Sequence, residues 1–280
     1  GVLFTLEILL FNISMTSILP LLFSSLSATV IAYIFFGQEP MFAANLIPFS
    51  MGNIPFYIIL GFFCGGVSLY FTRTTLALED RIKKISSPYG RWALCALGLG
   101  VLIFLFPPLY GEGYSSIMTL LSGSDFVLDR GSMLSNILDG PWLLLLFVFC
   151  VLVFKVFAMS FTNAGGGVGG TFGPTLFIGG IAGFVMARFA NLSGFSVPEP
   201  NFVLVGMAGT MAGVMQAPLT AIFLIAEISG GYELLIPLIL TSAISFAFTR
   251  SIEPYSIYTK RIAKKGELLT HDSDQAVLTL

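Results

Sequence analysis

The stretch AGGGVGGTFGPTLFIGGIAGFVMAR, residues 164–188, decides how this chain is organised. Five of the six residues in Gly165–Gly170 are glycine, and Thr171-Phe172-Gly173-Pro174 follows before a long apolar run. Proline suits the first turn of a helix, because its missing N–H would be unpaired there anyway. The sequence therefore predicts a helix that starts near Pro174, with Thr171 to Gly173 at its N-terminus. Since the first N–H groups of a helix lack internal partners and carry partial positive charge, we expect an anion-binding helix end.

The composition predicts that this helix end lies inside a membrane. The chain has 280 residues, of which 56% are hydrophobic and 10% charged, with a mean hydropathy of +0.92. Soluble domains carry about 25% charged residues, so we expect an all-α polytopic membrane protein in contact with the lipid bilayer. The net charge of -2 is uninformative about partners, and no nucleic acid partner is expected. Cys64, Cys95 and Cys150 lie in apolar runs without metal-ligand spacing, which predicts reduced thiols and no metal site.

The apolar runs differ in length, and several are interrupted by glycine or proline. The expected helices are Ile13–Phe36, Pro55–Leu78, Trp92–Phe106, Pro141–Ser160, Leu176–Ala190, Val203–Met215, Leu219–Ile228 and Leu234–Phe248. Residues 109–140 are the least hydrophobic and are expected to hold short helices outside the main spans. Irregular backbone survives at membrane depth only where it is buried in protein or lines a wet cavity, so the breaks favour a transport protein. Excess Lys and Arg at 73–91 and 260–265 predicts a cytoplasmic C-terminus.

Three ordered motifs resemble the CLC family of chloride channels and chloride/proton antiporters. GGTFGP at 169–174 resembles the GxFxP signature of the family's second half. Residues 206–241 resemble the helix pair that follows there, including the Ala-Pro-Leu-Thr turn, and SIYTKR at 256–261 resembles the last helix, whose tyrosine points into the pore. Residues 1–10 resemble the helix that closes the first half. The resemblance covers essentially the whole chain.

This resemblance implies a CLC-type inverted-repeat fold with short broken half-helices, and a homodimer with one pore per subunit. Residues 1–12 would be the end of a truncated first-half helix, and 13–263 the rest of the transmembrane domain. Residues 264–280 would be a cytoplasmic linker, which in many family members leads into CBS domains that are absent here. The family's first-half motifs, with a central-site serine and a gating glutamate, have no counterpart in these residues and are expected upstream in the parent protein.

The resemblance also implies where an anion binds. The backbone N–H groups of Thr171 and Phe172 would hold a dehydrated central anion, with Gly170 and Gly173 beside them. Because burying an unpaired charge is very costly, such an ion needs several donors at once, and uncharged amides supply them while still letting the ion leave. The alternative is a tight glycine turn that only lets helices pack.

Two tyrosines compete for the position in the pore. Ungapped matching of SIYT selects Tyr258, whose hydroxyl would donate to the anion. Tyr255, three residues earlier, takes its place if the register shifts by one residue. Either ring is also compatible with an ordinary aromatic residue at the membrane interface.

Charged side chains within apolar runs are functional hypotheses by default, and Glu7, Glu227 and Lys155 are among them. Glu7 and Glu227 match positions where the family has a structural acid satisfied by nearby backbone, and we favour that role for both. In proton-coupled members a second glutamate follows the position of Glu7, but Ile8 stands there, which favours a passive channel or another proton route. Lys155 would add positive potential near the anion, reach an interface or pair with an acid; we favour a structural role.

The sequence thus predicts an anion transport protein without catalytic chemistry or cofactor, with chloride as the permeant ligand. It would work as a channel or as a chloride/proton antiporter. The alternative is a secondary transporter of another small anion, such as fluoride, nitrate or a small carboxylate. A larger organic substrate would require more polar side chains near Gly165–Pro174 than the chain offers.

Overall fold

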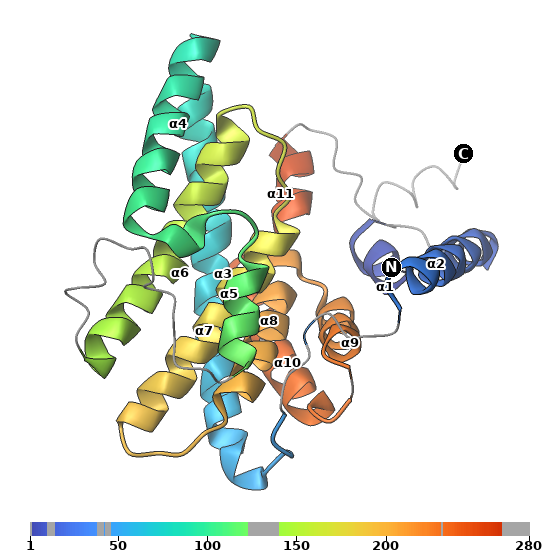
Figure 1. Cartoon of the computed structure of the whole chain (residues 1–280). Helices are drawn as coiled ribbons and strands as arrows, with labels where there is room; N and C mark the ends of the chain where they lie inside the picture. The colour runs from blue at the N-terminus through green and yellow to red at the C-terminus, as the bar shows by residue number, and fades with distance from the viewer. Residues whose placement is uncertain are drawn as a thin grey trace.

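The computed structural model describes residues 2–9, 15–37, 42, 46–122, 140–230 and 232–264, and its regular elements are all helical (Figure 1). The elements in chain order are α1 (Val2–Phe4), the π-helix η1 (Thr5–Leu9), α2 (Met15–Phe36), the 3-10 helix η2 (Met51–Asn53), α3 (Ile54–Lys83), α4 (Pro88–Leu105), the 3-10 helix η3 (Pro107–Leu109), α5 (Tyr114–Leu121), α6 (Pro141–Ala164), α7 (Phe172–Leu192), α8 (Glu199–Met215), α9 (Pro218–Ile228), α10 (Leu235–Ile252) and α11 (Ile257–Lys264).

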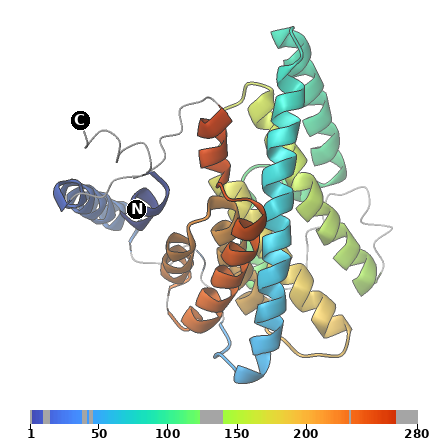
Figure 2. The same cartoon turned by 180° about the vertical axis from the view of Figure 1, so that it is seen from behind.

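Six stretches in the described part of the chain are long and apolar enough to cross a membrane. They are Ile18–Phe35, Met51–Lys83, Pro88–Leu105, Pro141–Ala164, Phe172–Leu192 and Leu235–Arg261. The longest helix, α3, runs from one end of the molecule to the other, and α10 lies beside it (Figure 2). The expected all-helical, multi-pass membrane architecture is therefore confirmed.

Helix α8 forms the centre of the bundle. Every residue from Asn201 to Met215 is buried, and α7, α10 and α3 pack around it. A helix that is apolar on all sides, as α8 is, has no face suited to water and belongs in the interior. Its small residues, among them Gly206, Gly209 and Gly213, let the neighbouring helices approach on several sides. The core around α8 holds α7, and so fixes the direction in which the α7 N-terminus points.

The α7–α8 crossing depends on glycine on both helices. A Cβ at Gly183 would overlap the carbonyl oxygen of Phe202, and one at Gly179 would lie 2.6 Å from the carbonyl oxygen of Gly206. Neither position has room for a Cβ atom. The backbones of α7 and α8 are therefore in direct contact. Gly179 and Gly183, four residues apart on α7, thus form a small-residue contact between helices.

Gly183→Ala is expected to destabilise the protein by about 1–3 kcal/mol, the usual cost of overfilling a packed core. The obstruction is backbone, which cannot rotate away as a side chain would. Thermal unfolding of the purified full-length protein in detergent measures the effect. Gly100→Ala on α4 is the matched control, because a Cβ there meets nothing within 4 Å. Equal unfolding temperatures for the two variants would contradict the prediction.

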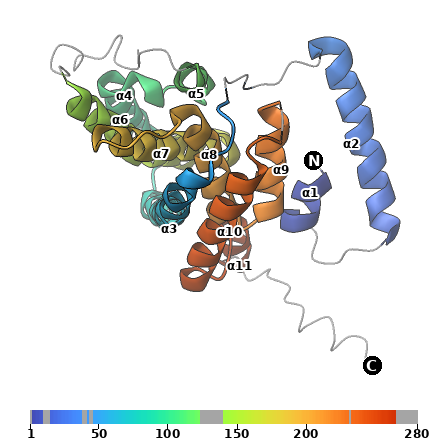
Figure 3. The ribbon, with the colours of Figure 1, turned by 90° about the horizontal axis from the view of Figure 1, so that it is seen from below.

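Helix α2 stands apart from the bundle, and α1 lies between it and α9 (Figure 3). None of the window Ile18–Phe35 is buried inside the chain. Large apolar side chains such as Phe23, Ile34 and Phe35 are exposed along it. Since this surface cannot face water, lipid or another polypeptide must cover it.

Several helices begin or end away from their expected positions. α7 begins at Phe172 rather than Pro174, because Thr171 already takes the N-cap position. α3 continues through the charged segment to Lys83, where Arg81 and Lys83 complement the C-terminal end of the helix dipole. α8 begins at Glu199 rather than near Val203. Of the short helices expected in residues 109–140, α5 is present, and residues 123–139 lie outside the described part.

Candidate anion site at the α7 N-terminus

The glycine-rich segment turns the chain from the end of α6 into the start of α7. Helix α6 closes with the Gly165 N–H donating to the Phe161 carbonyl at 2.9 Å, and the Gly167 N–H donates to the Thr162 carbonyl at 2.9 Å. Between them Gly166 has a φ of 103°, which an L side chain would rarely adopt. The backbone then stays exposed as far as Gly170. Val168, which is exposed, carries the one side chain in residues 165–170. The segment therefore leads into the α7 N-terminus as nearly bare backbone.

The first turn of α7 presents unpaired backbone donors. Thr171 is the N-cap residue and is 2% exposed, and its carbonyl accepts from the Thr175 N–H at 3.1 Å and the Thr175 hydroxyl at 2.6 Å. Within the described residues no partner is found for the N–H groups of Thr171, Phe172 and Gly173, as expected for the first turn of a helix. Three uncharged donors therefore gather where the helix dipole is positive.

Tyr258 meets this helix end from 87 residues away in sequence. The Thr171 hydroxyl donates to the Tyr258 hydroxyl oxygen at 2.9 Å. Because that oxygen accepts, the proton of the Tyr258 hydroxyl remains available for another acceptor. The arrangement places a fourth donor beside the three amides.

The orientation of Tyr258 follows from a capped short helix. Ser256 caps α11, since its hydroxyl oxygen accepts the Thr259 N–H at 3.2 Å. Tyr258, in the first turn, is half-buried, whereas Tyr255 precedes the helix and is 43% exposed. Of the two tyrosines that the sequence left in competition, the structure brings Tyr258 to Thr171.

The remaining predicted residues surround the same point. Phe172 is half-buried, and its ring packs edge-on against Phe4 with centroids 6.2 Å apart. Gly170 is exposed, and a Cβ there would lie 3.9 Å from the Phe172 nitrogen. A Cβ on Gly173 would lie 3.5 Å from the Tyr114 hydroxyl, so the missing side chain allows that phenol to approach.

Tyr114 is a residue that the sequence analysis missed. It begins α5, and burial together with the nearby Glu112 raises the pKa of its phenol, so the hydroxyl stays protonated at neutral pH. It can therefore donate near the α7 N-terminus. The available signal was weak: a lone tyrosine after Glu112 and Gly113, in the least hydrophobic part of the chain.

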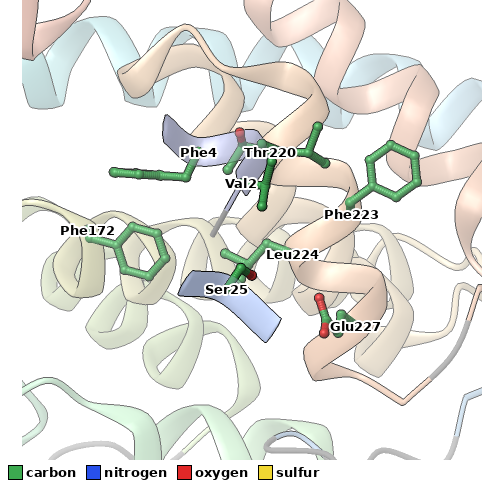
Figure 4. A pocket seen from close by; sticks show the side chains of 9 residues that line it. Val2, Phe4, Ser25, Phe172, Thr220, Phe223, Leu224 and Glu227 are labelled. Atoms are coloured by element: carbon green, nitrogen blue, oxygen red, sulfur yellow. The ribbon is translucent and has the colours of Figure 1, made fainter. Parts of the chain in front are cut away.

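Two pockets border the α7 N-terminus. One, of about 540 Å³, is bounded by Phe172 and by side chains of α1, α2 and α9; its lining is Val2, Leu3, Phe4, Ser25, Phe172, Thr220, Phe223, Leu224 and Glu227 (Figure 4). The other, of about 360 Å³, is lined by Gly169, Gly170 and Pro174 on the glycine side, and by Glu112 and Lys155. The helix start therefore forms part of the wall of both spaces.

Glu7 holds the start of the neighbouring half-helix. Its two carboxylate oxygens accept the N–H groups of Leu219 at 3.0 Å and Thr220 at 2.7 Å, at the N-terminus of α9. A carboxylate there pairs orphan amides and complements the dipole, so the structural role expected for Glu7 is confirmed. Glu227, at the other end of α9, is exposed and lines the larger pocket, so the backbone contact expected for it is not seen.

Glu7→Gln is expected to lower stability by about 1.5–3 kcal/mol, the usual worth of hydrogen bonds to a charged group. The amide retains only one acceptor oxygen for the two N–H groups. Chemical denaturation of the full-length protein measures the change. Glu227→Gln is the matched control, because Glu227 lies on α9, the helix that Glu7 caps, and no backbone partner is found for its carboxylate among the described residues. A loss at Glu227 as large as that at Glu7 would count against the capping role.

Lys155 is a buried cation with local partners. It is 3% exposed, and its Nζ donates to the carbonyls of Leu109 at 3.1 Å and Gly111 at 2.7 Å. The ammonium also lies 4.6 Å from the centre of the Phe177 ring, within cation–π range. Lys155 thus ties the segment before α5 to α6 and α7, which confirms its structural role.

The three cysteines are free thiols, with Cys64 and Cys95 buried and Cys150 half-buried. Across the described ranges, no three His, Cys, Asp or Glu side chains gather closely enough to hold a metal ion. The groups at the α7 N-terminus are mainly amides and hydroxyls, which suit an anion. One carboxylate is also near, because a Cβ on Gly173 would lie 4.0 Å from the carboxyl carbon of Glu112.

Comparison with known proteins gives the family of this chain. The chain belongs to the voltage-gated chloride channel family, which it matches over residues 1–250. It is 32% identical over 233 residues to chloride channel protein CLC-e of Arabidopsis thaliana, covering 77% of this chain and 31% of that protein. It is 29% identical over 275 residues to a putative chloride channel protein ClcB-like of Ralstonia nicotianae, covering 95% of this chain and 59% of that one.

A solved structure shares the fold. The crystal structure of a slow cyanobacterial Cl-/H+ antiporter superimposes with a TM-score of 0.75 at 26% identity, covering 95% of this chain and 60% of that one. The predicted CLC-type fold is therefore confirmed. The chain spans about a third to three fifths of the length of these relatives.

Proposed function

We propose that this chain carries the second half of an anion pore, and that the pore transports chloride across a membrane. Chloride would bind at the α7 N-terminus, held by the amides of Thr171 and Phe172 and by the Tyr258 hydroxyl. Gly170 and Gly173 would leave the approach open. The observation that carries the proposal is the hydrogen bond from Thr171 to Tyr258, because it leaves the tyrosine proton free beside unpaired amides.

The chemistry of these donors suits a permeant ion. A dehydrated halide needs several hydrogen bonds to offset the cost of leaving water. Amides and hydroxyls provide them without a full positive charge, so the bound ion is able to leave again. The buried cation Lys155 is held by two carbonyls. It adds positive potential at a distance without trapping the anion.

The test uses the full-length parent protein in liposomes loaded with chloride. Chloride is expected to leave much faster than from protein-free liposomes once a counter-ion pathway is supplied. External fluoride, nitrate or formate then shows which anions compete. Efflux equal to that of empty liposomes would refute chloride transport, and efflux driven only by formate would favour the carboxylate alternative.

The mode of transport is a separate question. Relatives named as channels and a structural relative named as an antiporter both match this chain. Ile8 stands where proton-coupled members carry a glutamate, which supports passive conduction. An imposed chloride gradient distinguishes the two modes: uphill proton movement would establish antiport and contradict passive conduction.

Orientation and assembly complete the proposal. Glu79, near the basic end of α3, pairs with Arg261 of α11, so the two cationic regions share one side, which the positive-inside rule makes cytoplasmic. The 264–280 linker would follow on that side; residues 265–280 lie outside the described part.

The uncovered apolar surface of α2 supports a homodimer, with lipid over the remainder. Residues 1–12 and 13–263 would belong to the two halves of the membrane domain.

A further inference from the structure

The helix that carries Tyr258 has little to hold it in place by itself. α11 is eight residues long, Ile257–Lys264, and helices this short are marginal without tertiary contacts. The hydrogen bond to Thr171 is its link to the anion site. Ile257, the first residue of α11, is fully buried in the core and anchors that end. The position of Tyr258 then also depends on the contacts that follow along the helix.

A buried carboxylate just before α11 meets two cations. Glu253 is 9% exposed, its Oε1 accepts from Arg73 Nε of α3 at 2.7 Å, and its Oε2 pairs with Lys260 Nζ of α11. The backbone carbonyl of Glu253 accepts from Gln216 Nε2 at 2.6 Å, at the corner between α8 and α9. Glu253 thus connects α11 to α3 through its side chain and to the bundle centre through its backbone.

A second buried carboxylate holds the same helix. Glu79 of α3 is 7% exposed, and Arg261 Nη2 donates to its Oε1 at 2.6 Å. Arg261 is three residues after Tyr258, so both side chains project from neighbouring positions on one face of α11. Lys260 and Arg261 are consecutive residues of α11. Each pairs with a buried carboxylate outside α11, within one turn of Tyr258. We call Arg73, Glu79, Glu253, Lys260 and Arg261 the α11 clamp.

Ion pairs of this kind act on position more than on total stability. Removing charges from water offsets much of the attraction between buried partners, whereas removing one partner leaves an uncompensated charge. Both carboxylates are buried, whereas the cations are partly exposed. Glu253 pairs with Arg73 of α3 and Lys260 of α11, and Glu79, on α3, pairs with Arg261 of α11. Such a pair of contacts defines the rotation and height of a short helix.

We propose that Glu253 and Glu79 are positioning residues: through the α11 clamp they hold the Tyr258 hydroxyl against Thr171 and thereby set the affinity of the anion site. This inference rests on the proposed function of that site. The carboxylates do not touch the anion; they act through Tyr258. Loss of either clamp carboxylate therefore weakens anion binding only while the tyrosine hydroxyl is present.

The first experiment reads the position of Tyr258 without relying on transport. The full-length parent carries 3-fluorotyrosine at position 258, and its ¹⁹F NMR line is recorded in lipid nanodiscs. Glu253→Gln and Glu79→Gln are expected to shift or broaden that line. Glu199→Gln is the matched control, because Glu199 pairs with Arg188 at 3.1 Å away from α11. A line in both clamp variants identical to that of the parent would overturn the proposal.

The second experiment measures chloride flux against chloride concentration in liposomes. Glu253→Gln is expected to raise the half-saturating concentration about fivefold, which corresponds to about 1 kcal/mol, the net worth of one hydrogen bond. Tyr258→Phe is expected to raise it similarly, and the double variant no further. A merely structural carboxylate would reduce the amount of active protein without changing the half-saturating concentration. The proposal would be overturned if adding Glu253→Gln to Tyr258→Phe raised the half-saturating concentration a further fivefold.

A milder pair of variants covers the case in which Glu253→Gln does not fold. The Lys260 side chain is 25% exposed, so Lys260→Met and Lys260→Arg are both tolerated by the packing. Lys260→Arg is expected to restore the parent affinity and fluorine line, and Lys260→Met to change both. Absence of chloride flux in the parent would refute the proposed function, whereas an unmoved fluorine line in a conducting protein would refute the clamp alone.

Discussion

Replacing the peptide N–H of Phe172 with an ester oxygen is expected to weaken chloride binding about 10- to 150-fold, the range that corresponds to a hydrogen bond of about 1.5–3 kcal/mol to a charged group. The change is made by incorporating phenyllactic acid at position 172, so the ring and its contact with Phe4 are kept. The Phe172 N–H belongs to the first turn of α7 and closes no helical bond there. Its loss therefore removes a donor to the anion without removing a helical hydrogen bond. The ester also makes the Thr171 carbonyl, which accepts from Thr175, a weaker acceptor, and a control ester at Tyr89 has the same effect on its own helix.

The effect is measured as the shift in half-saturating chloride concentration in liposomes. An ester at Tyr89 is the matched control, because that residue also lies in the first turn of a helix, α4, and its side chain is 85% exposed. The control ester is expected to leave chloride affinity unchanged. Equal affinity for the Phe172 ester and the parent protein would show that this amide is not a ligand.

Local signals in the sequence were sufficient to predict the half-helix that carries this amide. The glycine run and Pro174 mark a break followed by a helix start, and these effects act within a few residues of their cause. The predicted start was two residues late only because Thr171 takes the N-cap position. The buried α7–α8 crossing was also predictable, since small residues four apart favour close helix contact.

Contacts between distant segments were beyond the sequence. The spacing of Tyr255 and Tyr258 could not show which of them reaches the site. Tyr258 does so because Ser256 caps α11 and the Tyr258 hydroxyl accepts a hydrogen bond from Thr171. The helix expected at Pro55–Leu78 stopped before Glu79, whose partner lies 182 residues further on. Tyr114 was missed for the same reason. Its position beside Gly173 depends on how α5 packs against α7.

Leucine at Gly170 is expected to reduce chloride flux about tenfold or more, the factor for each 1.4 kcal/mol of lost binding. Gly170 is exposed, its φ is not in the left-handed region, and a Cβ there meets nothing nearer than the Phe172 nitrogen at 3.9 Å. The side chain is therefore accommodated by the fold, but it occupies the space in front of the Phe172 N–H. An anion would have to displace it, or bind with fewer donors.

A graded series separates this steric effect from misfolding. Gly170→Ala is expected to reduce flux less than Gly170→Leu, with the unfolding temperature of both close to that of the parent. Gly100→Leu adds the same side chain at another open glycine, on α4, and is expected to leave flux unchanged. Full conduction by Gly170→Leu would mean that ions do not pass in front of Phe172. A loss of flux in a protein of unchanged stability would place the ion path between Gly170 and the first turn of α7, because no other group near that Cβ has changed.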